Sequence, residues 1–93
     1  KYNRLHIVWG SVRDKDITGI LALLPTEARY YFCEARIPRA MPAHELAEKA
    51  AGFGLQGLVI PDVNQALAAA RSSAGGGDLI FIGGSTFVVA ELD

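Results

Sequence analysis

The sequence predicts an α/β fold: a three-layer α/β/α sandwich around a mostly parallel, Rossmann-like sheet, built from about four β-α units. Three observations predict it. Short apolar runs alternate along the chain with amphipathic segments of helical period. The apolar runs lack the polar alternation of a half-exposed strand, which indicates strands covered on both faces. The amphipathic segments are about ten residues long, as expected for helices that connect parallel strands.

Four apolar runs are the predicted strands. The first ends at Gly10 and the last ends at Gly83, and both glycines interrupt a strand. The second run contains three consecutive aromatic residues, a side-chain type that favours strands. The predicted strands are residues 5–9, 29–33, 58–60 and 79–82.

The helices are predicted from their caps and their apolar spacing. Asp16 can cap a first helix that runs to Pro25, with apolar residues at i, i+3, i+4 and i+7 from Ile17. Asp62, with Gln65 three residues later, resembles a capping box for a helix over residues 63–71. A helix over residues 43–53 and a closing helix that starts at Ser85 or Thr86 complete the set. The expected inward side of the 43–53 helix is Leu46, Ala47, Ala50 and Phe53.

Length and composition fit a single domain over residues 1–93, with 51% apolar and 20% charged residues. A net charge of −1 gives no electrostatic footprint for nucleic acid or an anionic membrane, so neither is expected as a partner. The single Cys33 excludes a disulfide framework and indicates a core thiol in a reducing compartment. No apolar stretch spans a membrane and the polar start is not a signal peptide, so we predict a cytoplasmic protein. The chain begins almost at its first strand, so we expect a further part upstream.

Several chemical motifs are missing from the sequence. It contains no phosphate-binding loop of the Gly-x-x-x-x-Gly-Lys-Ser/Thr type, no Gly-x-Gly-x-x-Gly after the first strand, and no nucleophile-histidine set. Neither His6 nor His44 has ligand-type neighbours at a metal-binding spacing. We therefore predict no metal site, and no reaction catalysed by this chain alone.

Three segments follow predicted strands or lie near their carboxyl ends: residues 10–16, 36–39 and 83–86. In open parallel sheets, ligands bind beyond the carboxyl ends of the strands, where the strand order reverses. We therefore expect these segments to line one rim.

The glycine turn over residues 83–86 is the first candidate binding segment. Two glycines allow a ligand to approach the backbone, and a helix start capped by Ser85 offers unpaired N–H groups to an anion. The alternative is a plain strand-to-helix turn, which any β-α unit needs.

Charged residues supply the other candidates. Lys15, between Asp14 and Asp16, lies at a helix start, where the dipole disfavours a cation. A bound carboxylate or phosphate would give it a partner; the alternative is a solvated lysine beside capping aspartates. Arg39, held in a stiff loop by Pro38, could present its guanidinium to a carboxylate, or could be an ordinary surface arginine.

Residues 10–17, 37–40, 45–47 and 79–91, taken in order, resemble the carboxy-terminal domain of bacterial folylpolyglutamate synthase/dihydrofolate synthase. This is the glutamate-ligase domain shared with the Mur peptide ligases. The resemblance implies a larger enzyme whose ATP-binding domain is absent from this chain. It also implies that ATP phosphorylates the carboxylate of dihydropteroate or a folate, and that the amine of L-glutamate then attacks to form an amide.

The resemblance also assigns roles. ATP and Mg²⁺ are expected for the full-length enzyme and none for the chain alone, whose part is to receive glutamate and close over the nucleotide. A histidine-bearing family motif that contacts the nucleotide would lie upstream of residue 1. The substrate-binding residues expected from the motifs and the resemblance together are Asp14, Lys15, Asp16, Arg39, Gly83, Gly84 and Ser85.

Two other functions are compatible with the residues alone. A free-standing α/β module could bind a small anion or nucleotide through residues 83–86 for regulation. A protein-interaction domain of receiver-like topology is less favoured, because a phosphoacceptor aspartate should close the third strand and Pro61 intervenes before Asp62.

Overall fold

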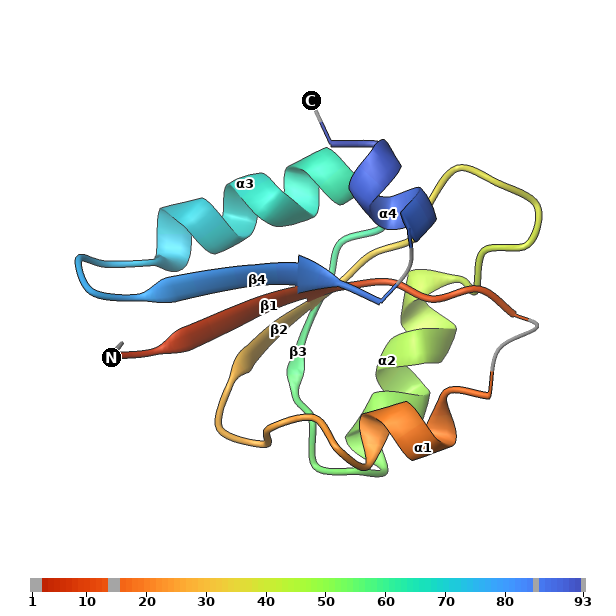
Figure 1. The fold of residues 1–93 in the computed structure, drawn as a ribbon, viewed down its shortest axis with the longest axis horizontal. Coiled ribbons are helices and arrows are strands. Elements are labelled where there is room, and N and C mark those ends of the chain that lie inside the picture. Colours follow the sequence, from red (N-terminus) through yellow and green to blue (C-terminus); the bar gives the residue numbers. More distant parts are fainter. Residues whose placement is uncertain (1–2, 14–15, 85, 93) are drawn as a thin grey trace.

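The computed structural model describes residues 3–13, 16–84 and 86–92. Strands and helices alternate along the chain, as predicted (Figure 1). The strands are β1 (Leu5–Trp9), β2 (Arg29–Phe32), β3 (Gly57–Val59) and β4 (Leu79–Gly83). The helices are α1 (Thr18–Leu21), α2 (Ala43–Ala51), α3 (Val63–Ser73) and α4 (Thr86–Ala90).

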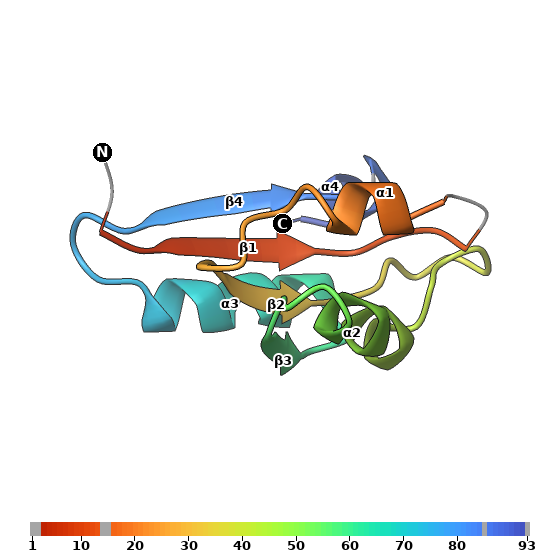
Figure 2. The same cartoon turned by 90° about the horizontal axis from the view of Figure 1, so that it is seen from below.

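The four strands form one parallel sheet in the order β3-β2-β1-β4. All of them point in the same direction, so their carboxyl ends share one edge of the sheet (Figure 2). At the centre, Val8 of β1 is in register with Tyr31 of β2 and Ile82 of β4. The chain moves outward from β1 to β3 and then returns to the other side of β1, so the strand order reverses between β1 and β4. A ligand site is therefore expected beyond the ends of these two strands.

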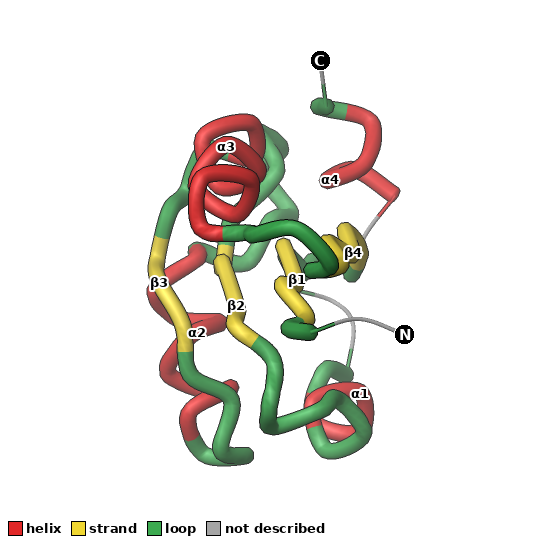
Figure 3. Tube along the Cα trace, turned by 90° about the vertical axis from the view of Figure 1, so that its left-hand side faces the viewer, coloured by secondary structure: helices red, strands yellow, loops and turns green. Residues whose placement is uncertain are grey.

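Helices cover both faces of the sheet, with α1 and α2 on one face and α3 and α4 on the other (Figure 3). Alternate residues of each strand enter opposite cores, because successive strand side chains point to opposite faces. The predicted three-layer architecture is confirmed. The core on the α2 face is Ile7, Trp9, Ile17, Leu21, Ala28, Tyr30, Phe32, Met41, Leu46, Ala50 and Leu55. The core on the α3 face is Val8, Tyr31, Cys33, Ala35, Val63, Ala66, Ala70 and Val88.

Burial of the strands differs from the sequence prediction at the margins of the sheet. The central strands are covered on both faces, as predicted. At the edges, however, Leu58 of β3 is 56% exposed and Phe81 of β4 is 51% exposed. Both side chains stay partly exposed although α2 packs against β3 and α4 against β4.

The first and second helices also end earlier than predicted. The 17–24 segment is helical only over Thr18–Leu21, and turns lead from there to Pro25. The second helix ends at Ala51, so Phe53 lies beyond it and is 36% exposed instead of facing inward. Leu55 enters the core in that region.

Of the two predicted aspartate caps, only that of Asp62 occupies the N-cap position of its helix. The Asp62 carboxylate accepts a hydrogen bond from the Gln65 backbone N–H at 2.9 Å, and α3 begins at the next residue. Asp16 lies one residue before the N-cap position of α1, which is Ile17, and its carboxylate accepts from the backbone N–H and the hydroxyl of Thr18 at 3.2 and 2.7 Å. No helix in the described part of the chain is long and apolar enough to cross a membrane.

Candidate functional site

Backbone hydrogen bonds join two of the predicted rim segments at the carboxyl edge. The Arg13 N–H donates to the Arg39 carbonyl at 2.7 Å, and the Met41 N–H donates to the Ser11 carbonyl at 2.9 Å. Val12 and Ala40 form an antiparallel bridge between these two bonds. The loop after β1 and the loop after β2 therefore form one two-stranded ledge joined by backbone hydrogen bonds.

The glycine turn after β4 lies directly against the end of β1. The Gly10 N–H donates to the Gly83 carbonyl at 3.4 Å. Gly84 has a φ of +99°, and a Cβ added to it would lie 2.1 Å from the Gly10 carbonyl oxygen. The third predicted segment thus joins the same edge. A glycine is needed at position 84 because the backbone of Gly10 lies so close to it. This favours a plain strand-to-helix turn over a ligand-binding role for Gly84.

Three of the predicted substrate-binding residues, Asp14, Lys15 and Ser85, lie outside the described residues, and their roles stay predictions. Asp16 is exposed at the start of α1, and Arg39 is exposed on the loop after β2. Both therefore lie on the carboxyl side of the sheet, with side chains accessible from solvent.

A hollow of about 210 Å³ lies beside the ledge, between the loop after β1 and α2. Arg13, Asp16 and Thr18 line one side of it, and Glu45 and Lys49 of α2 line the other. The Arg13 guanidinium lies 3.3 Å from the Glu45 carboxylate, a partly exposed pair that stabilises the fold by at most about 1 kcal/mol. Weak pairs of this kind can exchange partners when a charged ligand enters.

The sequence analysis missed Arg13, Glu45 and Lys49 as site residues. Its helical period placed Glu45 and Lys49 on the solvent side of their helix. They are four residues apart and therefore share one side of α2. The signal in the sequence was this charged pair, but only the packing of α2 beneath the loop after β1 directs it towards the rim.

Cys33 follows β2 and is fully buried beneath α4. Burial, together with the nearby carboxylates of Glu91, Glu34 and Asp62, raises the pKa of its thiol to about 12. A thiol of this kind stays protonated and unreactive. The predicted core role of Cys33 is confirmed.

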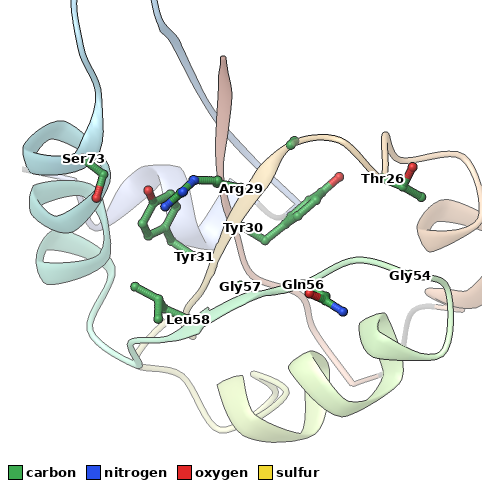
Figure 4. Close-up of a pocket in the computed structure, with 10 residues that line it drawn as sticks. Thr26, Arg29, Tyr30, Tyr31, Gly54, Gln56, Gly57, Leu58 and Ser73 are labelled. Carbon is green, nitrogen blue, oxygen red and sulfur yellow. The ribbon is translucent and has the colours of Figure 1, made fainter.

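A larger hollow, of about 530 Å³, lies at the opposite, amino edge of the sheet. Arg29 and Tyr31 of β2 enter it from one side, with Ser73 of α3 nearby and Leu58 of β3 below (Figure 4). None of the predicted site residues lines this hollow, and it lies far from the reversal of strand order. We therefore place the candidate site at the carboxyl edge.

Among the described residues, no group of three or more histidine, cysteine, aspartate or glutamate side chains is arranged to hold a metal ion. The chemistry available at the carboxyl edge comes from cations, from carboxylates and from the backbone of the ledge. Such a set suits a small zwitterionic or anionic ligand.

The chain is similar to known proteins. Residues 1–86 match the family model of the Mur ligase, glutamate ligase domain. The chain is 39% identical over 92 residues to a protein of Halobacterium salinarum named "Probable bifunctional folylpolyglutamate synthase/dihydropteroate synthase". That match covers 97% of this chain and 11% of the archaeal protein.

Solved structures show the same fold. E. coli FolC in complex with DHPP and ADP superimposes with a TM-score of 0.84 and 34% identity, over 97% of this chain and 21% of FolC. The bifunctional folylpolyglutamate synthase/dihydrofolate synthase of Yersinia pestis, complexed with AMPPNP and Mn ion, has a TM-score of 0.78 and 28% identity. That match covers 94% of this chain and 20% of the Yersinia protein. This chain thus spans about a fifth of its solved relatives, and it belongs to the Mur ligase family as a glutamate ligase domain.

Proposed function

We propose that this chain is the glutamate-receiving and closing domain of an ATP-dependent amide ligase that adds L-glutamate to dihydropteroate or a folate. The match of residues 1–86 to a glutamate ligase domain carries the proposal. Related structures support it: E. coli FolC was solved with DHPP and ADP, and a folylpolyglutamate synthase/dihydrofolate synthase with Mn, AMPPNP and L-glutamate.

The charges at the carboxyl edge suit glutamate, which has two carboxylates and one amine. Arg13 and Lys49 lie beside the hollow at the ledge, and Arg39 is exposed on the neighbouring loop. A guanidinium can bind a carboxylate through two parallel hydrogen bonds. Asp16 and Glu45 provide acceptors for the ammonium group of the same ligand. We propose that Lys15 and the turn over residues 83–85 complete this set.

The nucleotide would be held mainly by a separate ATP-binding domain, because this chain has no phosphate-binding loop. ATP would activate the carboxylate of the acceptor. We propose that the longer protein uses Mg²⁺ together with ATP. This domain would contribute a preformed ledge that binds glutamate. When the domain closes, it would exclude water from the site.

The test is glutamate-dependent amide formation with ATP and dihydropteroate or a folate. We expect turnover from the longer protein that carries this domain and none from the 93-residue chain alone. Ser85→Ala in the longer protein should weaken glutamate use modestly, by the roughly 0.5–2 kcal/mol of one lost hydrogen bond or helix cap. A longer protein that forms no glutamyl product with either acceptor would refute the proposal.

The proposed place of action is the cytoplasm. The single free cysteine, which the structure buries, is compatible with the reducing compartment expected from the sequence. Fractionation of cells that produce the longer protein would test it.

A further inference from the structure

Helix α4 contains only five residues, too few to be stable by itself. Its position is set by tertiary contacts. Val88 is 1% exposed and packs in the core on the α3 face. A Cβ on Gly10 would lie 2.7 Å from the Val88 side chain, so α4 also packs closely against the end of β1.

The residue after α4, Glu91, joins this helix to two other elements. Its carboxylate accepts a hydrogen bond from the backbone N–H of Arg36, in the loop after β2. Its main-chain carbonyl accepts from the Asn64 side-chain amide, in the first turn of α3, at 2.8 Å. Glu91 therefore connects the segment that follows the glycine turn to the loop that carries Arg39.

The Arg36 end of this connection is itself anchored. The Arg36 guanidinium donates to the carboxylate of Asp62, which also caps α3. Three residues further along, the Arg39 carbonyl accepts from the Arg13 N–H at 2.7 Å. Contacts thus run from α4 through Glu91, Arg36 and Arg39 to the loop after β1, and link all three segments of the rim.

We infer that Glu91 is a positioning residue: its carboxylate holds the Arg36–Arg39 loop in register with the glycine turn, so that the rim meets glutamate as one preorganised unit. This inference rests on the proposed function. Glu91 need not touch substrate, and its effect would be carried by the loop that it holds.

Kinetics of the longer protein test the functional part of this inference. Glu91→Ala should raise the KM for glutamate about tenfold, as expected for the loss of one charge-assisted contact, with kcat little changed. Glu91→Gln keeps an oxygen acceptor for the Arg36 N–H and should stay within about threefold of wild type. The matched control is Glu48→Ala, which removes an exposed glutamate from α2 and should change nothing.

Amide hydrogen exchange in the 93-residue chain tests the contact independently of any ligase activity. The Arg36 N–H should be protected in the wild type and should exchange about tenfold faster or more in Glu91→Ala, but not in Glu48→Ala. An unprotected Arg36 amide in the wild-type chain would overturn the inference even if the variant failed to fold. So would Glu91→Ala with a lowered melting temperature but the wild-type KM, since that is the signature of a purely structural residue. A longer protein without glutamate-dependent activity would instead refute the proposed function.

Discussion

The two edges of the sheet differ in how far buried side chains help to hold them together. At the carboxyl edge, the loop after β1 is joined to the loop after β2 by backbone hydrogen bonds and to the turn after β4 by glycine contacts. At the amino edge, backbone bonds such as that from the Leu79 N–H to the Arg4 carbonyl are supplemented by hydrogen bonds between buried side chains. His6 lies 2.9 Å from the Asp78 carboxylate through Nε2 and 2.9 Å from the Tyr31 hydroxyl through Nδ1.

This difference has a functional consequence. Backbone bonds join the two loops at the carboxyl edge, and Glu91 and Arg36 support them with side-chain contacts, while Arg13 and Asp16 remain exposed where a ligand can reach them. At the amino edge His6 is fully buried, and a tautomer with its proton on Nε2 satisfies both of its contacts. The Tyr30 hydroxyl also donates to the Pro25 carbonyl there, at 2.6 Å, and burial raises the pKa of Tyr30 to about 12. The side chains at this edge are committed to the fold.

The largest expected effect is at the glycine turn. Gly84→Val adds a Cβ that would lie 2.1 Å from a backbone oxygen, at a φ of +99°. Overpacking and backbone strain together should lower the free energy of unfolding by about 3–5 kcal/mol. Urea denaturation measures this loss. The control is Gly19→Ala in α1, where an added Cβ has no neighbour within 4 Å, and it should be neutral or slightly stabilising. Equal stability of the two variants would mean that the turn is not packed against β1.

The next effect is at the amino edge. His6→Ala creates a cavity and leaves Tyr31 and Asp78 without their shared partner, which should cost about 2–4 kcal/mol. Thermal unfolding followed by circular dichroism measures this change. His44→Ala, at an exposed position of α2, should leave the melting temperature unchanged. If both histidine variants had the melting temperature of the wild type, the contacts of His6 would not stabilise the amino edge.

Removing a basic side chain should affect glutamate use at the carboxyl edge but not at the amino edge. In the longer protein, Lys15→Ala should reduce glutamate-dependent turnover at limiting glutamate by roughly tenfold to hundredfold, the equivalent of a charge-assisted bond of about 1.5–3 kcal/mol. Arg29→Ala, which alters the larger hollow at the amino edge, should leave the KM for glutamate unchanged. If Arg29→Ala raised the KM for glutamate and Lys15→Ala did not, the glutamate site would lie at the amino edge, and the proposal would be wrong.

The smallest effect is a dependence of stability on acid. A backbone hydrogen bond from Gly75 and the contact with His6 hold the pKa of Asp78 below its ordinary value of 3.8. A carboxyl group whose pKa is lowered by folding stabilises the native state above its unfolded pKa, and this contribution is lost as the pH falls through its folded pKa. Stability should therefore decline below pH 3.8, and Asp78→Asn should flatten part of that decline in urea titrations between pH 2 and pH 5. An unchanged slope would show that Asp78 gains nothing from its partners.

Much of this protein follows from local patterns in its sequence. The order of strands and helices, the Asp62 cap and the burial of Cys33 all depend on residues close together in the chain, whose period and capping chemistry are readable without a structure. The rim could be anticipated for a similar reason, because the ends of parallel strands share an edge whatever their order.

Other features were decided only by the tertiary structure, because they depend on contacts between residues distant in sequence. The order β3-β2-β1-β4 brings Gly84 against Gly10 and gives the glycine a packing role that the turn motif does not reveal. The packing of α2 under the loop after β1 turns Lys49 towards the rim, and the return of the chain to β4 lets Asp78 reach His6 across 72 residues of sequence. Local patterns specify which elements form, whereas the pairing of those elements specifies which side chains meet.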